Sequence, residues 1–81
     1  MRLTPEEKKT LHELKKTIGK NIFENRRKQK IPLRRMSKWV GLRENKLDNY
    51  EIGLNELRLQ DLVKISSVLN VKVGNLLVNN D

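Results

Sequence analysis

Basic side chains concentrate in one quarter of the 81-residue sequence. Residues 26–46 contain nine lysines and arginines and a single acid, Glu44, so this segment has a net charge of +8. The whole chain also has a net charge of +8, so the rest is neutral overall. Such a cluster is expected of a surface that binds a polyanion through its phosphates. The alternative is a solvated basic face that maintains solubility.

The residue types that carry catalysis or bind metals are missing or isolated. The chain has no cysteine, so it has neither disulfides nor thiolate metal sites. The one histidine, His12, lies in a charged stretch without other ligands at metal spacing, and we expect it at the surface. No histidine stands beside a nucleophile, and no Gly-rich phosphate loop occurs. We therefore expect no enzyme activity, no metal and no cofactor.

The length and apolarity of the chain limit it to one small core. Eighty-one residues leave no room for a second core, and association or ligand binding would add substantially to a modest stability. No apolar run exceeds three residues, which argues against a membrane span. The first residues lack the apolar region of a signal peptide. We therefore expect a cytoplasmic, nucleoid-associated protein.

The first element that must position these charges is a long helix. Residues 4–7 combine an N-cap threonine, a first-turn proline and a capping-box glutamate. An apolar stripe at helical spacing continues from Leu11 to Ile22. Gly19 within it marks a kink, a close helix contact or the boundary of an N-terminal extension. Pro32 ends the segment, because the residue before a proline avoids helical geometry.

Shorter helices are predicted after Pro32. The apolar spacing indicates helices over residues 33–40, 44–51, 59–69 and 73–78. The helix over 59–69 would place Leu59, Leu62, Val63, Ile65, Ser66 and Leu69 on its apolar face. Gly41, Gly53 and Asn70 fit the left-handed positions that end helices. A strand beginning at Val71 is the alternative for the last segment, but it would have no partner.

Residues 33–53 have the features of two short helices that cross steeply. A small residue, Ser37, fits the place where the two backbones approach, and Gly41 permits a tight turn. The second helix would be held from below by three apolar anchors, Leu42, Leu47 and Tyr50. Such a pair projects its second helix, which can enter a DNA major groove about 12 Å wide.

From about Ile18 to Leu77 the sequence resembles the phage-repressor and Cro type of helix-turn-helix, the XRE-like family. The motifs that carry the resemblance are Ile18-Gly19, Arg26-Arg27, Ser37, Val40-Gly41-Leu42, Tyr50-Glu51-Ile52-Gly53, the segment 62–71 and Leu76-Leu77. The resemblance implies an all-α fold, a five-helix lambda-repressor-like DNA-binding domain with an N-terminal helical extension. The extension would span residues 1–17, the DNA-binding domain 18–78 and a frayed tail 79–81.

The chain departs from that family where the helix-turn-helix begins. Pro32 stands where the family usually has Ser or Thr, and Leu33 replaces a phosphate-binding Gln. The phosphate contact of that Gln is therefore absent, and Arg34 or Arg35 could substitute for it. Arg43 replaces a small hydroxyl cap, which weakens the N-cap by about 1 kcal/mol. It also places a cation where a phosphate could lie.

The resemblance implies which side chains read DNA bases. The outward face of the recognition helix would comprise Glu44, Asn45, Lys46, Asp48 and Asn49. Asn45 and Asn49 are four residues apart and could each pair with adenine. Lys46 could donate to guanine or to a phosphate, and Glu44 could accept from cytosine. Asp48 is expected to be an ordinary solvated residue. The alternative for all five residues is the same, namely polar side chains on a solvated helix that contact no base.

A second set of residues would contact phosphates or support the fold. The candidate phosphate contacts are Arg26, Arg27, Arg34, Arg35, Lys38, Arg43 and Asn55. Glu51 is expected to be structural and to pair with an arginine of the first helix. Trp39 stands where the family usually has an exposed polar residue. It would pack on the N-terminal turns through Leu3, Leu11 or Leu14, or belong to a protein–protein surface.

The first functional hypothesis is a sequence-specific transcription regulator, a repressor that binds double-stranded DNA as a homodimer. Half-sites would lie about 34 Å apart, and the interface would use Val71, Val73, Leu76 and Val78. The alternative is an antitoxin-like protein-interaction module that binds DNA secondarily and docks a partner through Met1–Thr17 and Trp39. A third hypothesis is non-specific binding of RNA or a membrane surface by the basic segment. It is less favoured, because it gives no role to the two short helices and the glycines that end them.

Overall fold

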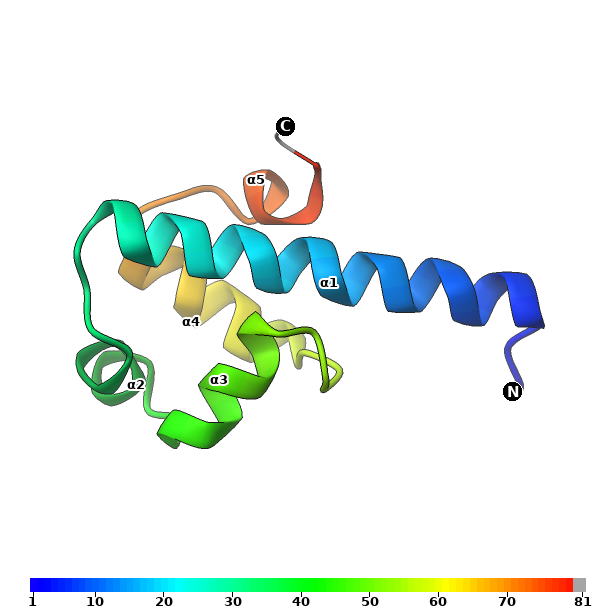
Figure 1. Ribbon diagram of the computed structural model, residues 1–81, viewed down its shortest axis with the longest axis horizontal. Coiled ribbons are helices and arrows are strands. Elements are labelled where there is room, and N and C mark those ends of the chain that lie inside the picture. Colours follow the sequence, from blue (N-terminus) through cyan, green and yellow to red (C-terminus); the bar gives the residue numbers. More distant parts are fainter. Residues whose placement is uncertain (80–81) are drawn as a thin grey trace.

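The first helix, α1 (Pro5–Lys28), is the element against which α3, α4 and α5 pack. The capping box forms as predicted: the Thr4 hydroxyl accepts from the Glu7 N–H at 3.1 Å, and the Thr4 N–H donates to the Glu7 carboxylate at 2.8 Å. The helix runs without a break through residue 17, where the extension was predicted to end. In the computed structural model, which describes residues 1–79, the first turns of α1 extend beyond the other helices (Figure 1).

The short helices of residues 1–79 agree with the predicted segments. They are α2 (Leu33–Val40), α3 (Glu44–Glu51), α4 (Leu59–Leu69) and α5 (Val73–Leu77). The last helix ends one residue earlier than predicted, and no strand forms at Val71 within the described part of the chain. The all-α class is therefore confirmed. Residues 80 and 81 of the predicted tail lie outside the described residues.

The turn between α2 and α3 depends on a left-handed backbone at Gly41, whose φ is 82°. The N–H groups of Gly41 and Leu42 both donate to the Ser37 carbonyl at 2.9 Å. Ser37 is buried, as expected of a small residue at a close approach. The turn therefore follows α2 at once and redirects the chain within three residues.

Gly19 is the point at which α1 touches the backbone of α3. A Cβ atom at this position would clash with the carbonyl oxygens of Tyr50 and Glu51. Of the three interpretations of Gly19, the structure supports a close helix contact, since α1 continues through it as a regular helix. Only glycine lets these two helices approach so closely.

The core lies between α1 and the other helices. Its buried apolar side chains within residues 1–79 are Ile18, Ile22, Met36, Val40, Leu47, Tyr50, Leu62, Ile65, Leu69 and Leu76. The predicted apolar face of α4 was too wide, because Leu59 is 79% and Val63 57% exposed. These two residues lie four apart on a flank of α4 that no other described element covers.

Candidate nucleic-acid interface

Helix α3 turns one face to the core and a polar face to solvent. Leu47, Tyr50 and Glu51 are buried, while Glu44, Asn45 and Asp48 are exposed and Asn49 is half-buried. At 100° per residue, Asn45 and Asn49 lie opposite the buried side chains. The polar outward face predicted for this helix is therefore present.

The C-terminal end of α3 is fixed to α1 by a buried ion pair. Arg26 Nε lies 2.7 Å from Glu51 Oε2, and its Nη2 donates to Oε1 at 3.0 Å. The Arg26 Nη1 also donates to the Ile31 carbonyl at 2.8 Å. The side chains are only 12% and 3% exposed, so this bidentate pair is shielded from water.

The pair confirms the prediction that Glu51 binds an arginine of the first helix. It also corrects the prediction that Arg26 contacts phosphate. Three of the five N–H donors of Arg26 are engaged inside the protein, and its guanidinium is nearly buried. Arg26 therefore positions α3.

A second tether joins α3 to α4. The Tyr50 hydroxyl donates to Asp61 Oδ2 at 2.7 Å, and both residues are buried. Burial, with a further contribution from Asp61, raises the pKa of Tyr50 to about 12. The phenol therefore stays protonated and keeps donating over the physiological range. The sequence analysis did not identify Asp61 as a partner of Tyr50. Its place beside the apolar positions of α4 was a signal that this acid could be buried and hydrogen-bonded.

Lys46 belongs to this tether. Its Nζ lies 3.9 Å from Asp61 Oδ2 and 5.9 Å from the centroid of the Tyr50 ring. It was predicted to read bases together with Asn45, but one residue along a helix is a rotation of 100°. Lys46 is therefore directed along the flank of α3 toward α4, away from the outward face.

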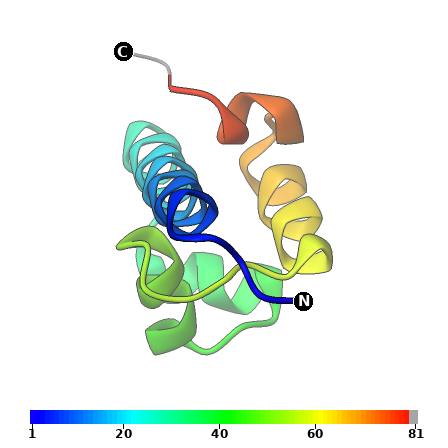
Figure 2. The same ribbon diagram turned by 90° about the vertical axis from the view of Figure 1, so that its right-hand side faces the viewer.

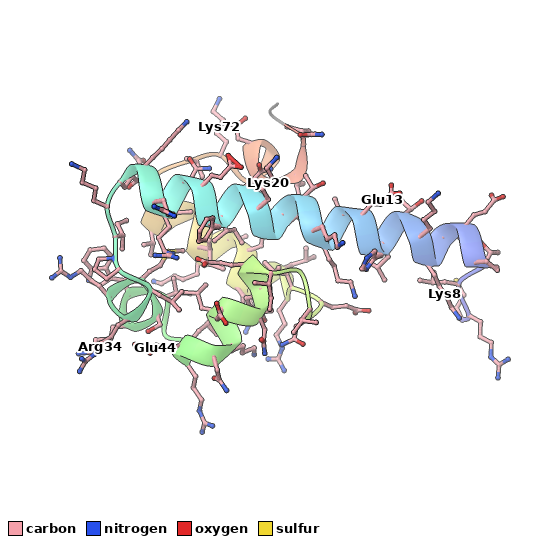
Figure 3. All side chains as sticks on the ribbon, viewed as in Figure 1. Lys8, Glu13, Lys20, Arg34, Glu44 and Lys72 are labelled. Atoms are coloured by element: carbon pink, nitrogen blue, oxygen red, sulfur yellow. The ribbon has the colours of Figure 1, made fainter. Side chains whose placement is uncertain are left out.

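The remaining cations of residues 26–46 gather at one end of the molecule. Arg34, Arg35 and Lys38 are exposed on α2 and surround a shallow hollow beside Pro32. The last turn of α1 and the following loop add three exposed cations, Arg27, Lys28 and Lys30. Arg43, exposed, precedes α3. In Figure 3, Arg34 and Glu44 lie at the end where α2 and α3 meet, and Arg34 extends outward.

Asn55 is not part of this cationic end. It lies in the loop between α3 and α4, and Figure 1 shows that loop on the side of α3 away from α2. Arg27 is partly engaged, because its guanidinium lies 5.5 Å from the Phe23 ring centroid. Of the predicted phosphate contacts, Arg34, Arg35, Lys38 and Arg43 are therefore the ones that the fold brings together in the open.

A solved structure shares this arrangement of helices. It is that of the restriction-modification controller protein C.AhdI from Aeromonas hydrophila, with a TM-score of 0.73 and 18% sequence identity. The match covers 76% of this chain and 94% of that one. The fold is that of C.AhdI. No protein-family model and no curated protein sequence matches the chain.

The likeness to C.AhdI confirms the predicted helical fold, while membership of the XRE-like family stays a prediction. Within residues 1–79, no helix is both long and apolar enough to span a membrane. The same residues contain no group of three side chains suited to hold a metal ion. His12 is exposed, as predicted.

Trp39 does not pack on the N-terminal turns. It is 51% exposed on α2, and Figure 1 shows α2 and the first turns of α1 at opposite ends of the molecule. Contact with Leu3, Leu11 or Leu14 is therefore impossible. For the same reason Trp39 and residues 1–17 do not form one continuous docking surface.

The predicted dimer interface is also wrong in its central residue. Leu76 is fully buried in the core, and Val71 and Val73 are half-buried against it. The reason is a buried amide on α1: Asn21 Nδ2 donates to the carbonyls of Leu76 and Val78 at 3.0 and 2.7 Å. This amide holds α5 on α1, which covers the side of α5 that was expected to face a partner.

Proposed function

We propose that the protein binds double-stranded DNA in a sequence-specific manner and regulates transcription as a repressor, reading the major groove with α3. The observation that carries the proposal is the placement of an uncovered polar face of α3 beside exposed cations of α2. Clamps to α1 and α4 at the opposite end of α3 support it, because a reading element must hold a fixed angle to the body.

Base reading would fall on two asparagines and one glutamate. Asn45 and Asn49 share the outward face, and each amide can pair bidentately with adenine. Glu44 in the first turn can accept from the cytosine amino group. Lys46, tethered to Asp61, would take a supporting role.

Phosphate binding would fall on Arg34, Arg35, Lys38 and Arg43. The first turns of α2 and α3 add backbone N–H groups, since Pro32 and Arg43 give no side-chain cap within the described structure. Uncapped helix N-termini favour anions. These contacts would position the protein on the duplex without specifying sequence.

The similar structure adds support at the level of fold, since its protein is described as a controller of restriction-modification. One helix of eight residues covers few base pairs. A homodimer on a near-palindrome, with half-sites about 34 Å apart, would therefore supply the required selectivity. Such a protein would act at the nucleoid in the cytoplasm. The antitoxin-like alternative is less supported, because it required residues 1–17 and Trp39 to form one docking surface, and these lie at opposite ends of the molecule.

Selection of bound duplexes from a random DNA pool tests the proposal. We expect an enriched motif with two-fold symmetry. Asn45→Ala should lower affinity for it about 10-fold or more, and only where the cognate base is present. Arg34→Ala should weaken binding to every duplex and reduce the salt slope by about 1. Gln60→Ala, an exposed amide on α4, is the control. A pool without enrichment would refute sequence-specific reading.

A further inference from the structure

The single cation within α3, Lys46, is held by a side chain of the following helix. Its Nζ lies 3.9 Å from Asp61 Oδ2 and 5.9 Å from the centroid of the Tyr50 ring. Asp61 belongs to the first turn of α4. Figure 2 shows the loop of residues 52–58 leading from α3 across to α4, whose first turn lies at the height of α3. An acid of α4 therefore stands beside the reading helix.

The two partners of this contact differ in freedom. The Asp61 carboxylate is buried and accepts the Tyr50 hydroxyl at 2.7 Å, so it is fixed in place. The Lys46 side chain is 39% exposed and ends in a flexible four-carbon stem. An ion pair with this much access to water contributes little free energy. The contact therefore restrains Lys46 without locking it, and another acceptor can compete for the ammonium.

A DNA base is such an acceptor. Lys46 precedes Asn49 by three residues, and side chains at this spacing are neighbours on a helix surface. An ammonium swung to that side could donate to O6 and N7 of guanine. The other candidate reading residues, Asn45, Asn49 and Glu44, suit adenine and cytosine. Guanine and Asp61 would therefore compete for the one ammonium of α3.

We propose that Asp61 is a positioning residue that restrains Lys46 and thereby weakens the reading of guanine by α3. The inference rests on the proposed function, because it requires α3 to lie in the major groove. To donate to guanine, Lys46 has to leave both Asp61 and the Tyr50 ring, so the net gain from that base is reduced. Base preference is a difference of affinities. A residue that touches no DNA therefore helps to set it.

The variant Asp61→Asn tests the proposal, because it removes the charge and keeps an acceptor for the Tyr50 hydroxyl. Selection from a random DNA pool, followed by titration of duplexes that differ in one base pair, compares it with the parent. We expect the preference for guanine at one position of a half-site to rise about 2- to 5-fold, the size of a partly exposed ion pair. The preference assigned to Asn45 should stay unchanged. Glu56→Gln, at an exposed acid of the preceding loop, changes the net charge equally and is the matched control.

A second substitution separates positioning from a general effect on the fold. Lys46→Met in the Asp61→Asn background should abolish the gained preference for guanine, whereas a loss of stability alone would leave base preference unmoved. In the parent background, Lys46→Met should change that preference less than 2-fold. This last measurement does not depend on the folding of Asp61→Asn. A parent that loses 10-fold or more of its guanine preference with Lys46→Met would overturn the proposal.

Two further results would also overturn it. One is an unchanged base preference in a folded Asp61→Asn protein. The other is a uniform gain of affinity for all duplexes with a steeper salt dependence, which would mean that the freed ammonium binds phosphate. In both cases an enriched motif that depends on Asn45 would leave the proposed function intact. If neither protein enriches any sequence, the proposed function itself fails, and the inference fails with it.

Discussion

The two ends of α3 are held in contrasting ways. At the C-terminal end, Glu51 pairs with Arg26, Tyr50 donates to Asp61, and the backbone lies directly on Gly19. At the N-terminal end, Arg43 supplies no side-chain cap within the described residues, and Arg43 and Glu44 are both exposed. One end is built for fixed orientation. The N-terminal end leaves the first backbone N–H groups of α3 and the Arg43 guanidinium accessible to a ligand, and the missing side-chain cap lowers the stability of the helix.

The largest expected effect comes from removing the buried carboxylate at the fixed end. Glu51→Ala leaves the Arg26 guanidinium buried without its partner and should lower the free energy of unfolding by about 3–5 kcal/mol. Urea denaturation followed by circular dichroism measures this. The double variant Glu51→Ala with Arg26→Met should recover part of the loss. A single variant as stable as the parent would show that the pair does not hold α3.

Closing the approach between the helices should have the next largest effect. Gly19→Ala places a methyl group against the carbonyls of Tyr50 and Glu51, and we expect a loss of about 3 kcal/mol. Gly74→Ala, where a Cβ would meet nothing within 4 Å, is the matched control. Equal melting temperatures for the two variants would contradict a close contact at residue 19.

The tyrosine tether should contribute less and should depend on pH. Tyr50→Phe removes one buried hydrogen bond and leaves Asp61 without its donor, which should lower stability by about 1–2 kcal/mol at neutral pH. In the parent, the pKa of Tyr50 is raised to about 12 from 10.0 in the unfolded chain. The contribution of the phenol is therefore complete below pH 10 and is lost as the pH rises toward 12.

Urea titrations at several alkaline pH values measure this component. The difference in stability between parent and Tyr50→Phe should shrink between pH 10 and 12, a comparison that cancels the titration of the lysines common to both proteins. A difference that stays constant over that interval would show that burial does not favour the protonated phenol.

The smallest effect is expected at the open end and has the opposite sign. Arg43→Ser supplies a side-chain N-cap for α3 and should stabilise the fold by about 1 kcal/mol. It also removes a candidate phosphate contact, so DNA affinity should fall several-fold for all sequences alike. Thermal melting and salt-dependent binding titrations measure the two quantities. A variant that gains both stability and affinity would contradict the contrast between the two ends of α3.

The helices could be predicted from sequence because their ends are encoded locally. The capping box at Thr4 and the left-handed positions at Gly41 and Asn70 each need only neighbouring residues. The outward face of α3 followed from the apolar anchors Leu47 and Tyr50.

The errors concern contacts between segments distant in sequence. The approach of Lys46 to Asp61 was also not foreseen, because nothing local shows that Asp61 lies beside it. Base reading by Lys46 stays a prediction. Leu76 was assigned to a dimer interface. The sequence does not show that α1, whose Asn21 lies more than fifty residues earlier, packs on the helix of Leu76. Trp39 could be separated from the N-terminal turns only once the direction of α1 relative to α2 was known.

The unbroken course of α1 has a mechanical consequence. Residues 11–18 of α1 border an apolar hollow beside α4 and α5, and Arg26 near the other end of α1 binds Glu51 of α3. One unbroken helix of 24 residues, about 36 Å long, therefore joins the two regions. Because α1 has no break, a tilt of its N-terminal half is transmitted to the end that holds α3. The angle of α3, and with it the surface offered to DNA under the proposed function, would therefore depend on whatever contacts the N-terminal half of α1.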